Sequence, residues 1–186
     1  LENSALGLLA GLTHAFPDQV RRLNRVAARI SPQGERRGPS YQVFASERRV
    51  RFVELEYALP VERGPACLRA LGRLLREGGF EVALPVEYRR VAADDMDLSP
   101  FQGRDSVTLS VHLSHRASWR ACFEACERLL LSQGGRPHWG KLHCLDWRRL
   151  RTLFPGWDAF QHQRARLDPQ GRFQSPRLCH LLGPAA

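Results

Sequence analysis

The sequence predicts an α+β fold, in which helices pack on one face of a single antiparallel sheet. Short runs that alternate apolar and polar residues have the period of half-buried strands. These runs and amphipathic helical runs follow the order strand, strand, helix, strand, strand, helix, and then helices only. The 186 residues, 43% of them hydrophobic and 25% charged, suit one globular domain. We therefore expect a single domain over residues 1–186 with its helices on one side of the sheet.

Residues 1–40 are predicted to be a helical lead-in. Two helices are expected, over residues 4–16 and 18–30, with Pro17 where a first helical turn tolerates proline. The segment 31–40 is rich in glycine, proline and charged residues and is predicted to be a loop. The second helix has an apolar stripe at helical spacing, made of Leu23, Val26, Ala27 and Ile30.

Residues 41–144 are predicted to hold the sheet and two helices. Tyr41–Ser46 and Val50–Leu59 form an expected hairpin, joined at the letters SERR. In the second run, alternation puts apolar side chains on one face and Glu54 and Glu56 on the other. The apolar face is therefore the one that points to the core.

The rest of the domain follows the same rules. Strands are predicted at Phe80–Val91 and Ser106–Ser114, with a polar loop between them. Amphipathic helices are predicted at residues 64–77, where two glycines end the helix, and at residues 117–132. Residues 145–186 complete the domain as a helical tail. Its three short helices are predicted around residues 145–153, 156–166 and 175–182.

Two of the predicted strands carry polar side chains on one face. Alternation places Glu87 with Arg89, and Ser110 with His112. If the strands are neighbours, one sheet face presents a carboxylate, a guanidinium, a hydroxyl and an imidazole. Each of these groups hydrogen-bonds sugar hydroxyls, and His or Glu can take a proton. From the pattern alone, a solvated face with a surface ion pair is the simpler interpretation, because polar faces of antiparallel sheets usually meet water.

The segment RPHWGKLH (136–143) is the second candidate. It places a tryptophan beside a glycine, between His138 and Lys141. Lys141 is the single lysine among 28 Lys and Arg residues. Because the sequence otherwise uses arginine, this one lysine indicates a position that needs a compact ammonium rather than a planar guanidinium. Chance survival of one surface lysine is the alternative.

The formal net charge is +9. Such a surplus is typical of proteins that bind nucleic acid or an acidic surface. The arginines are spread along the chain rather than gathered in an aromatic-laced patch, so we expect no nucleic-acid partner. A solvated basic face is the plainer interpretation, and contact with an anionic membrane or an acidic domain stays open.

The five cysteines are odd in number and include no CxxC pair. Cys122, Cys126, His143 and Cys144 form an imaginable zinc set, but the tight spacing of structural zinc motifs is missing, so no metal is expected. Free cysteines favour a reducing, cytoplasmic setting, with membrane association left open. No apolar run reaches the roughly 18 residues that span a bilayer. The opening letters LENSALGLLAGL lack the basic region of a signal peptide.

Several segments resemble the C-terminal region of the sugar-1,4-lactone oxidases. This family, of D-arabinono-1,4-lactone oxidase and alditol oxidase type, belongs to the vanillyl-alcohol oxidase superfamily of FAD-linked oxidases. HWGK followed by LDPxGRF is the specific part of the resemblance, which runs over nearly the whole chain. The similar stretches are VFASERRVRFVELEYALP (43–60), PVEYRRVAADDMDLSPFQGRDS (85–106), SVH (110–112), RPHWGKLH (136–143) and FPGWDAFQHQRARLDPQGRF to LCHLL (154–182).

The resemblance implies a division of labour. In such enzymes an N-terminal domain binds FAD, and a C-terminal cap domain lies over the flavin and forms the substrate site. We expect residues 1–186 to be that cap, with the FAD-binding domain as its partner, absent from this chain, and the fragment alone to be inactive. The expected reaction is oxidation of a sugar lactone or alditol, with oxygen or another electron acceptor. The alternative is a non-catalytic basic binding module that docks on an acidic partner, nucleic acid or a membrane.

The resemblance also implies roles for particular residues. Glu87 and Arg89 match a Glu-x-Arg pair on a cap strand that meets the substrate near the flavin. A histidine of the family aligns with His112 in some members and with Ser110 in others, which leaves the base unassigned. The resemblance thus predicts catalytic roles for Glu87, Arg89, Lys141 and His112, and substrate- or cofactor-facing positions for Ser110, His138 and Trp139.

Overall fold

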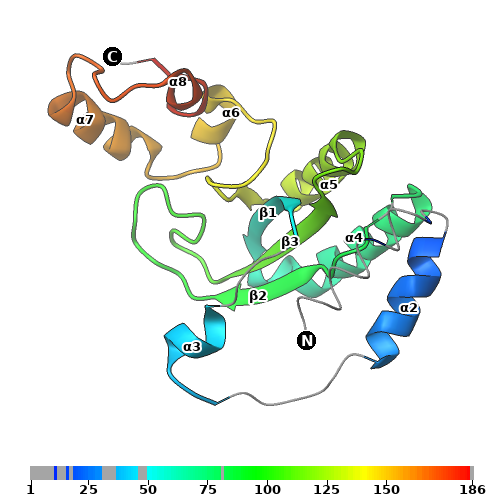
Figure 1. The fold of residues 1–186 in the computed structure, drawn as a ribbon. Helices are drawn as coiled ribbons and strands as arrows, with labels where there is room; N and C mark the ends of the chain where they lie inside the picture. The colour runs from blue at the N-terminus through cyan, green and yellow to red at the C-terminus, as the bar shows by residue number, and fades with distance from the viewer. Residues whose placement is uncertain are drawn as a thin grey trace.

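A four-stranded antiparallel sheet lies at the centre of the computed structural model, with the strand order β2-β3-β1-β4 (Figure 1). The structure describes residues 11, 16, 19–30, 37–45, 50–80 and 82–184. The α+β prediction with a single antiparallel sheet is confirmed. The strands are β1 (Phe52–Pro60), β2 (Glu87–Val91), β3 (Ser106–Ser114) and β4 (Arg136–Pro137).

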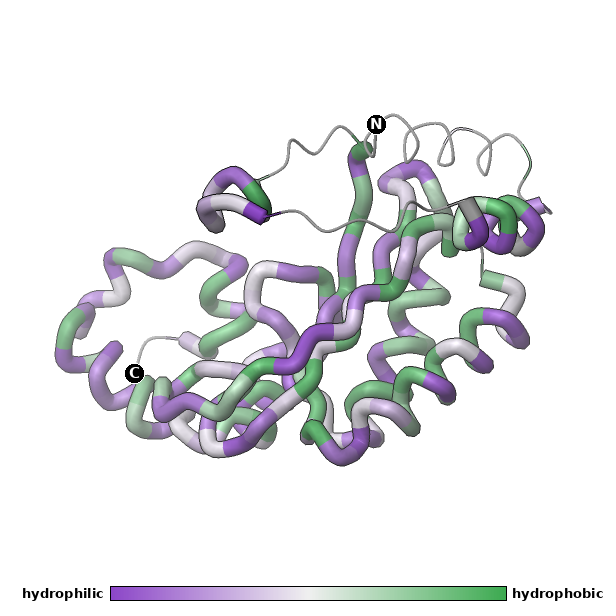
Figure 2. The backbone as a smooth tube through the Cα atoms, turned by 90° about the horizontal axis from the view of Figure 1, so that it is seen from below, coloured by the Kyte–Doolittle hydropathy of each residue, from purple (hydrophilic) through white to green (hydrophobic). Residues whose placement is uncertain are grey.

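Helices α4 (Gly64–Glu77) and α5 (Arg120–Ser132) cover one face of this sheet, as predicted. Their buried cysteines and leucines pack against the alternating apolar residues of β1 and β3, such as Leu55, Tyr57 and Leu109. Burial of each such side chain contributes about 1.5–3 kcal/mol, so this layer holds the domain together. Figure 2 shows hydrophobic and hydrophilic residues alternating along the chain, as amphipathic elements require.

Local sequence explains the limits of α4. Proline lies in its first turn, and Gly78 ends the helix with its amide on Leu74 O. Gly79 follows with φ +66, a conformation that glycine adopts at low cost. At the other end, a Cβ on Gly64 would lie 2.6 Å from both Tyr88 Oη and Val107 Cγ2. Helix α4 can therefore approach the sheet closely only with glycine at position 64.

The C-terminal helices form a second, smaller core. Helix α6 (Trp147–Arg151), α7 (Trp157–Leu167) and α8 (Pro176–Leu182) match the three short helices predicted for the tail. Their cluster of buried residues includes Leu150, Phe154 and Trp157. Asp146 and Ser175 cap α6 and α8 by accepting backbone N–H groups.

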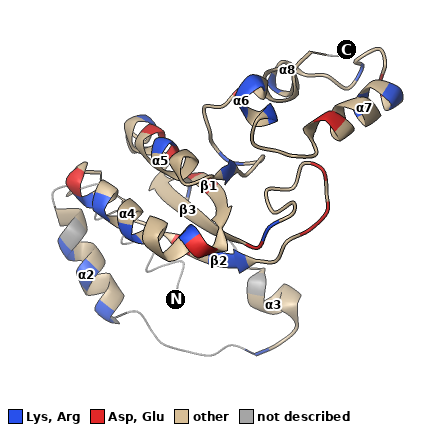
Figure 3. Cartoon of the chain, turned by 180° about the vertical axis from the view of Figure 1, so that it is seen from behind, with Lys and Arg blue, Asp and Glu red and all other residues tan. Residues whose placement is uncertain are grey.

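The N-terminal helices partly follow the prediction. Helix α2 (Val20–Ile30) confirms the second predicted helix, and Asn24 Nδ2 donates to Val82 O at 2.9 Å. The helix predicted at 4–16 and most of the loop predicted at 31–40 lie outside the described residues. Figures 1 and 3 show α2 beside α4, and Figure 3 shows Lys and Arg distributed over several helices rather than on one face.

One strand prediction was wrong. Residues 41–44 of the strand predicted at Tyr41–Ser46 are helical instead, because Ser40–Phe44 form helix α3. Pro39 precedes it, and its carbonyl accepts the amides of Gln42 and Val43, which starts a helical turn. The SERR turn expected next lies outside the described residues.

The strand predicted over Phe80–Val91 is shorter than expected. Only Glu87–Val91 pairs with β3. Pro85 offers no N–H to a ladder, and its carbonyl instead faces the ring of His112. The polar half of the predicted strand, Glu87–Val91, therefore forms as a strand, and its side chains alternate between the two faces of the sheet.

Candidate functional site

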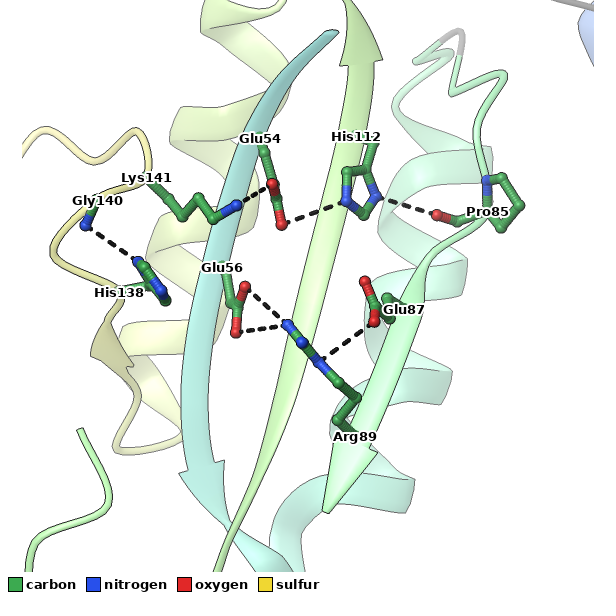
Figure 4. Close-up of polar contacts among 9 residues, drawn as sticks. All are labelled: Glu54, Glu56, Pro85, Glu87, Arg89, His112, His138, Gly140 and Lys141. Carbon is green, nitrogen blue, oxygen red and sulfur yellow. Dashed lines mark hydrogen bonds and ion pairs between the residues drawn. The ribbon is translucent and has the colours of Figure 1, made fainter. Parts of the chain in front are cut away.

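The face of the sheet opposite α4 and α5 carries the polar side chains. Strands β2 and β3 are neighbours, so Glu87 lies opposite Ser110 and Arg89 lies opposite Thr108. On the other side of β3, strand β1 places Glu54 opposite His112 and Glu56 opposite Ser110. The strand register therefore confirms the predicted grouping of Glu87, Arg89, Ser110 and His112 on one face. Strand β1 adds the carboxylates of Glu54 and Glu56 to this face (Figure 4).

Arg89 is the centre of one cluster on this face. One terminal nitrogen of Arg89 donates to both carboxylate oxygens of Glu56, at 3.1 Å each. Its Nε lies 3.3 Å from Glu87 Oε1. The Arg89 and Glu87 side chains are 51% and 44% exposed, whereas Glu56 is 5% exposed. A buried carboxylate thus anchors the guanidinium, while the outer groups stay open to a ligand.

Glu54 is the centre of the second cluster. Its Oε2 accepts a hydrogen bond from Lys141 Nζ, and its Oε1 lies 3.3 Å from His112 Nε2. Burial alone would raise the pKa of this carboxyl. The hydrogen bond from Lys141 and the charges of His112 and Lys141 outweigh it and hold the pKa of Glu54 below its ordinary value. Glu54 is therefore an anion at neutral pH.

Both ring nitrogens of His112 face oxygen atoms that can accept hydrogen bonds. Nδ1 lies 3.2 Å from Pro85 O, and Nε2 faces Glu54. A carbonyl and a carboxylate accept hydrogen bonds but do not donate them. Each contact is a hydrogen bond only when its nitrogen carries a proton. The edge-on ring of Phe52, with centroids 5.2 Å apart, holds the imidazole from a further side.

The loop that carries Lys141 is hydrogen-bonded to the edge of β1, next to the residues that pair with β4. After β4, the amide of His138 donates to Glu56 O at 3.0 Å and the amide of Leu142 donates to Glu54 O at 2.9 Å. His138 Nδ1 accepts the amide of Gly140 at 3.0 Å. His138 thus shapes the turn from within, and the turn directs Lys141 onto the polar face (Figure 4).

Trp139 anchors the same turn from the other side. Its indole Nε1 donates to Leu98 O at 2.7 Å, and its ring packs 4.8 Å from the ring of Phe154. Half-buried Trp139 also lines a groove of about 600 Å³ next to the Glu54 cluster. The other residues of this groove are Phe52, Val53, Glu54, Gly140, Lys141, Leu142 and Arg177.

Two hydroxyls lie beneath the clusters. Ser110 and Thr108, on the central strand, are 0% and 2% exposed. Neither side-chain oxygen has a hydrogen-bond partner in the described part of the chain. A buried hydroxyl left without a partner costs free energy, so this layer of the face has spare hydrogen-bonding capacity.

Glu54 and Glu56 were not among the predicted site residues. Alternation had placed both on the polar face of their strand, which was the available signal. The sequence pattern does not give the strand order. Glu56 reaches Arg89 only because β3 lies between β1 and β2. The predicted residues Glu87 and Arg89 touch each other, whereas Lys141 and His112 meet through Glu54 rather than directly.

Among the described residues, no three His, Cys, Asp or Glu side chains gather as a metal site would require. In the same part of the chain, no helix has the length and apolar character needed to cross a bilayer. Cys122 and Cys126 are buried in the core beside α4, away from the polar face.

The chain is similar in sequence to a known family and to several known proteins. Residues 1–180 match a family described as D-arabinono-1,4-lactone oxidase. The chain is 37% identical to L-gulono-1,4-lactone dehydrogenase of Mycobacterium tuberculosis over 183 residues, which are 98% of this chain and 43% of the relative. It is 31% identical to L-gulonolactone oxidase of Bos taurus over 145 residues, 75% of this chain and 33% of the relative. It is 33% identical to alditol oxidase of a Streptomyces species over 133 residues, 70% of this chain and 31% of the relative. The chain thus spans less than half the length of these relatives.

Proposed function

Because this chain belongs to the D-arabinono-1,4-lactone oxidase family, we propose that it is the substrate-covering part of an FAD-dependent sugar oxidoreductase. The substrate is a sugar lactone or an alditol, which is oxidised at a CH–OH group. The curated relatives are named for gulonolactone and alditol oxidation, which supports this substrate class. FAD is held mainly by a separate N-terminal domain, and the polar face of the sheet lies against the reacting part of the cofactor.

One observation carries the proposal. Glu87 and Arg89 on β2 lie on the same face of the sheet as Lys141, which comes from the loop after β4, and on this face Arg89 pairs with Glu56 and Lys141 pairs with Glu54 (Figure 4). A purely electrostatic docking module would need basic residues on one continuous face, whereas these cations are each matched to a carboxylate. The geometry therefore supports recognition of a small polar molecule more than docking on an acidic surface.

The residues present suit a hydroxyl-rich substrate. Arg89 and Glu87 offer exposed hydrogen-bond donors and acceptors. A site built from hydrogen-bonding groups binds polyols because each substrate hydroxyl can both donate and accept. The adjacent groove, about 600 Å³, gives room for the substrate to extend past Lys141 towards Arg177.

The chemistry has a defined balance. The carbinol C–H bond breaks with its electron pair, the O–H bond gives up a proton, and a C=O bond forms. When bound, the flavin supplies the hydride acceptor. Arg89 and Lys141 would face it and stabilise the negative charge that collects there, because preorganised cations act strongly in a site shielded from water. Exposed carboxylates such as Glu87, or water at the open face, take the hydroxyl proton.

The test is anaerobic reduction of the flavin in the complete gene product by a panel of aldonolactones and alditols. We expect at least one of them to bleach the flavin absorbance, and Lys141→Ala and Arg89→Ala to slow that reduction. Peroxide formation on admitting air separates an oxidase from a dehydrogenase. A flavoprotein that no sugar on the panel reduces, or variants that react like the native protein, would overturn the proposal.

A further inference from the structure

Glu54 joins two side chains that come from separate parts of the fold. Lys141 lies on the loop after β4, and His112 lies on β3, two strands away from that loop in the sheet order β3-β1-β4. The two carboxylate oxygens of Glu54 divide between them, Oε2 to Lys141 and Oε1 to His112. The Glu54 side chain is 9% exposed, so solvent does not compete freely for either contact.

Neighbouring side chains occupy both carboxylate oxygens of Glu54. The titratable side chains that face it are Lys141 and His112, and the far side of the His112 ring meets Pro85 O and the edge of Phe52. Its backbone carbonyl accepts the amide of Leu142, so the strand and the Lys141 loop are fastened at the same residue. Glu54 lines the groove beside Lys141, but both of its carboxylate oxygens are engaged by its two partners.

A lysine needs such a partner more than an arginine does. Its ammonium sits on a flexible four-carbon stem, and an unpaired ammonium moves over several rotamers. Reaction rates respond strongly to position, and a misplacement of about 1 Å costs on the order of 100-fold. A nearly buried carboxylate that fixes the ammonium therefore has a direct effect on the rate.

We infer that Glu54 is a positioning residue, which holds the Lys141 ammonium and the His112 ring at fixed points of the polar face. The inference rests on the proposed function, because the rate it controls is that of flavin reduction by the substrate. Glu54 does not touch the reacting atoms and acts through its two partners.

Position and charge predict opposite effects of neutralising Glu54. Glu54→Gln removes a negative charge and leaves the face more cationic, which favours the negative charge that the flavin gains on reduction. If charge alone mattered, the variant would reduce its flavin at least as fast as the native protein. If Glu54 acts by position, the rate of flavin reduction falls although the electrostatic field of the polar face has become more favourable.

The experiment has two readouts on the complete, flavin-loaded gene product. The first is the rate constant of flavin reduction at saturating sugar, measured by anaerobic stopped flow. The second is the rate of reductive methylation of Lys141, measured by mass spectrometry of its peptide. Lys141 is the only lysine of residues 1–186, so any labelled peptide from this region reports on it. Glu77→Gln, which neutralises a carboxylate at the exposed end of α4, is the matched control.

We expect Glu54→Gln to lower the reduction rate on the order of 10- to 100-fold and to raise the methylation rate of Lys141 several-fold. Glu54→Asp keeps the charge but shortens the side chain, so both of its rates should lie between those of the native protein and those of Glu54→Gln. A double-mutant cycle adds a test that a misfolded variant cannot mimic: once Lys141→Gln is present, Glu54→Gln should cost much less than it does alone.

The inference is overturned if Glu54→Gln reduces its flavin as fast as the native protein, or if its reduction slows while Lys141 reacts at the native rate. Additive costs in the cycle would overturn it too. A native flavoprotein that no sugar reduces would contradict the proposed function instead, and the methylation rate would still test the contact between Glu54 and Lys141.

Discussion

Arg89 on β2 donates to Glu56 on β1 across the whole width of β3, at 3.1 Å to each carboxylate oxygen. The pair spans the central strand on the polar face and lies directly over the buried hydroxyls of Ser110 and Thr108. This bridge links the outer strand β2 to the strand that carries Glu54, so the two clusters share one rigid support.

Loss of Arg89 should lower both activity and stability. Arg89→Ala removes a cation from the open part of the face, and we expect flavin reduction to slow on the order of 100-fold. It also leaves Glu56, which is 5% exposed, without its partner, at a cost of about 1–3 kcal/mol in unfolding free energy. Stopped-flow reduction and thermal unfolding measure the two effects. The neighbouring Arg90→Ala, on the opposite side of the strand, should leave the rate within about twofold, and an equal loss in both variants would argue against the site.

Arginine should not replace the single lysine. Lys141→Arg keeps the positive charge, but a planar guanidinium on a longer reach does not fit the turn that brings the ammonium to Glu54. We expect the reduction rate to fall at least about tenfold in Lys141→Arg, and further in Lys141→Gln. Both rates are measured with the same sugar under anaerobic conditions. An arginine variant with native activity would mean that only the charge is needed at this position.

His143 should weaken the fold in mild acid. Burial, together with the charges of Arg177 and His180, lowers the pKa of His143 to about 4. An unfolded histidine titrates near about 6.5, so the unfolded chain binds more protons between these values and stability falls as pH drops from about 6.5 to about 4. The loss is on the order of 2–3 kcal/mol across the window.

The variant His143→Gln tests this pH dependence. Because glutamine carries no titrating group, the thermal midpoint of the variant should change less between pH 7 and pH 5 than that of the native protein. His162→Gln, at an exposed position of α7, is the matched control and should keep the native dependence. Parallel pH curves for the native protein and His143→Gln would show that this ring does not couple protonation to folding.

A buried hydroxyl helps to hold the segment after the Lys141 turn. Tyr57, which is fully buried, donates to Glu127 Oε2 at 2.6 Å, and the same carboxylate accepts the amide of Cys144. Tyr57→Phe leaves Glu127, 6% exposed, with the amide alone, and should destabilise the protein by about 1–3 kcal/mol. Denaturant unfolding measures this change. Tyr41→Phe, at an exposed tyrosine, should be neutral, and a neutral Tyr57→Phe would mean that water replaces the hydroxyl.

Local periodicity predicted those elements whose residues alternate cleanly. Strand β3 was predicted with its observed limits, because every second residue of Ser106–Ser114 is apolar, and α4 was predicted at residues 64–77 from its amphipathic pattern and the two glycines that end it. Prediction failed where a proline changed the backbone. Pro39 starts a helical turn at Ser40–Phe44, and Pro85 prevents residues before Glu87 from joining the sheet.

The sequence by itself determined the fold class, the family and the side of each strand on which a polar residue lies, because alternation and local motifs are properties of neighbouring residues. Only the tertiary structure decided which of those residues meet. Glu56 reaches Arg89 because β3 pairs with both β1 and β2, and Glu54 reaches Lys141 because the loop after β4 returns along the edge of β1. These contacts join residues 33 and 87 positions apart, and strand pairing over such separations is set by the packing of the whole sheet rather than by any local pattern.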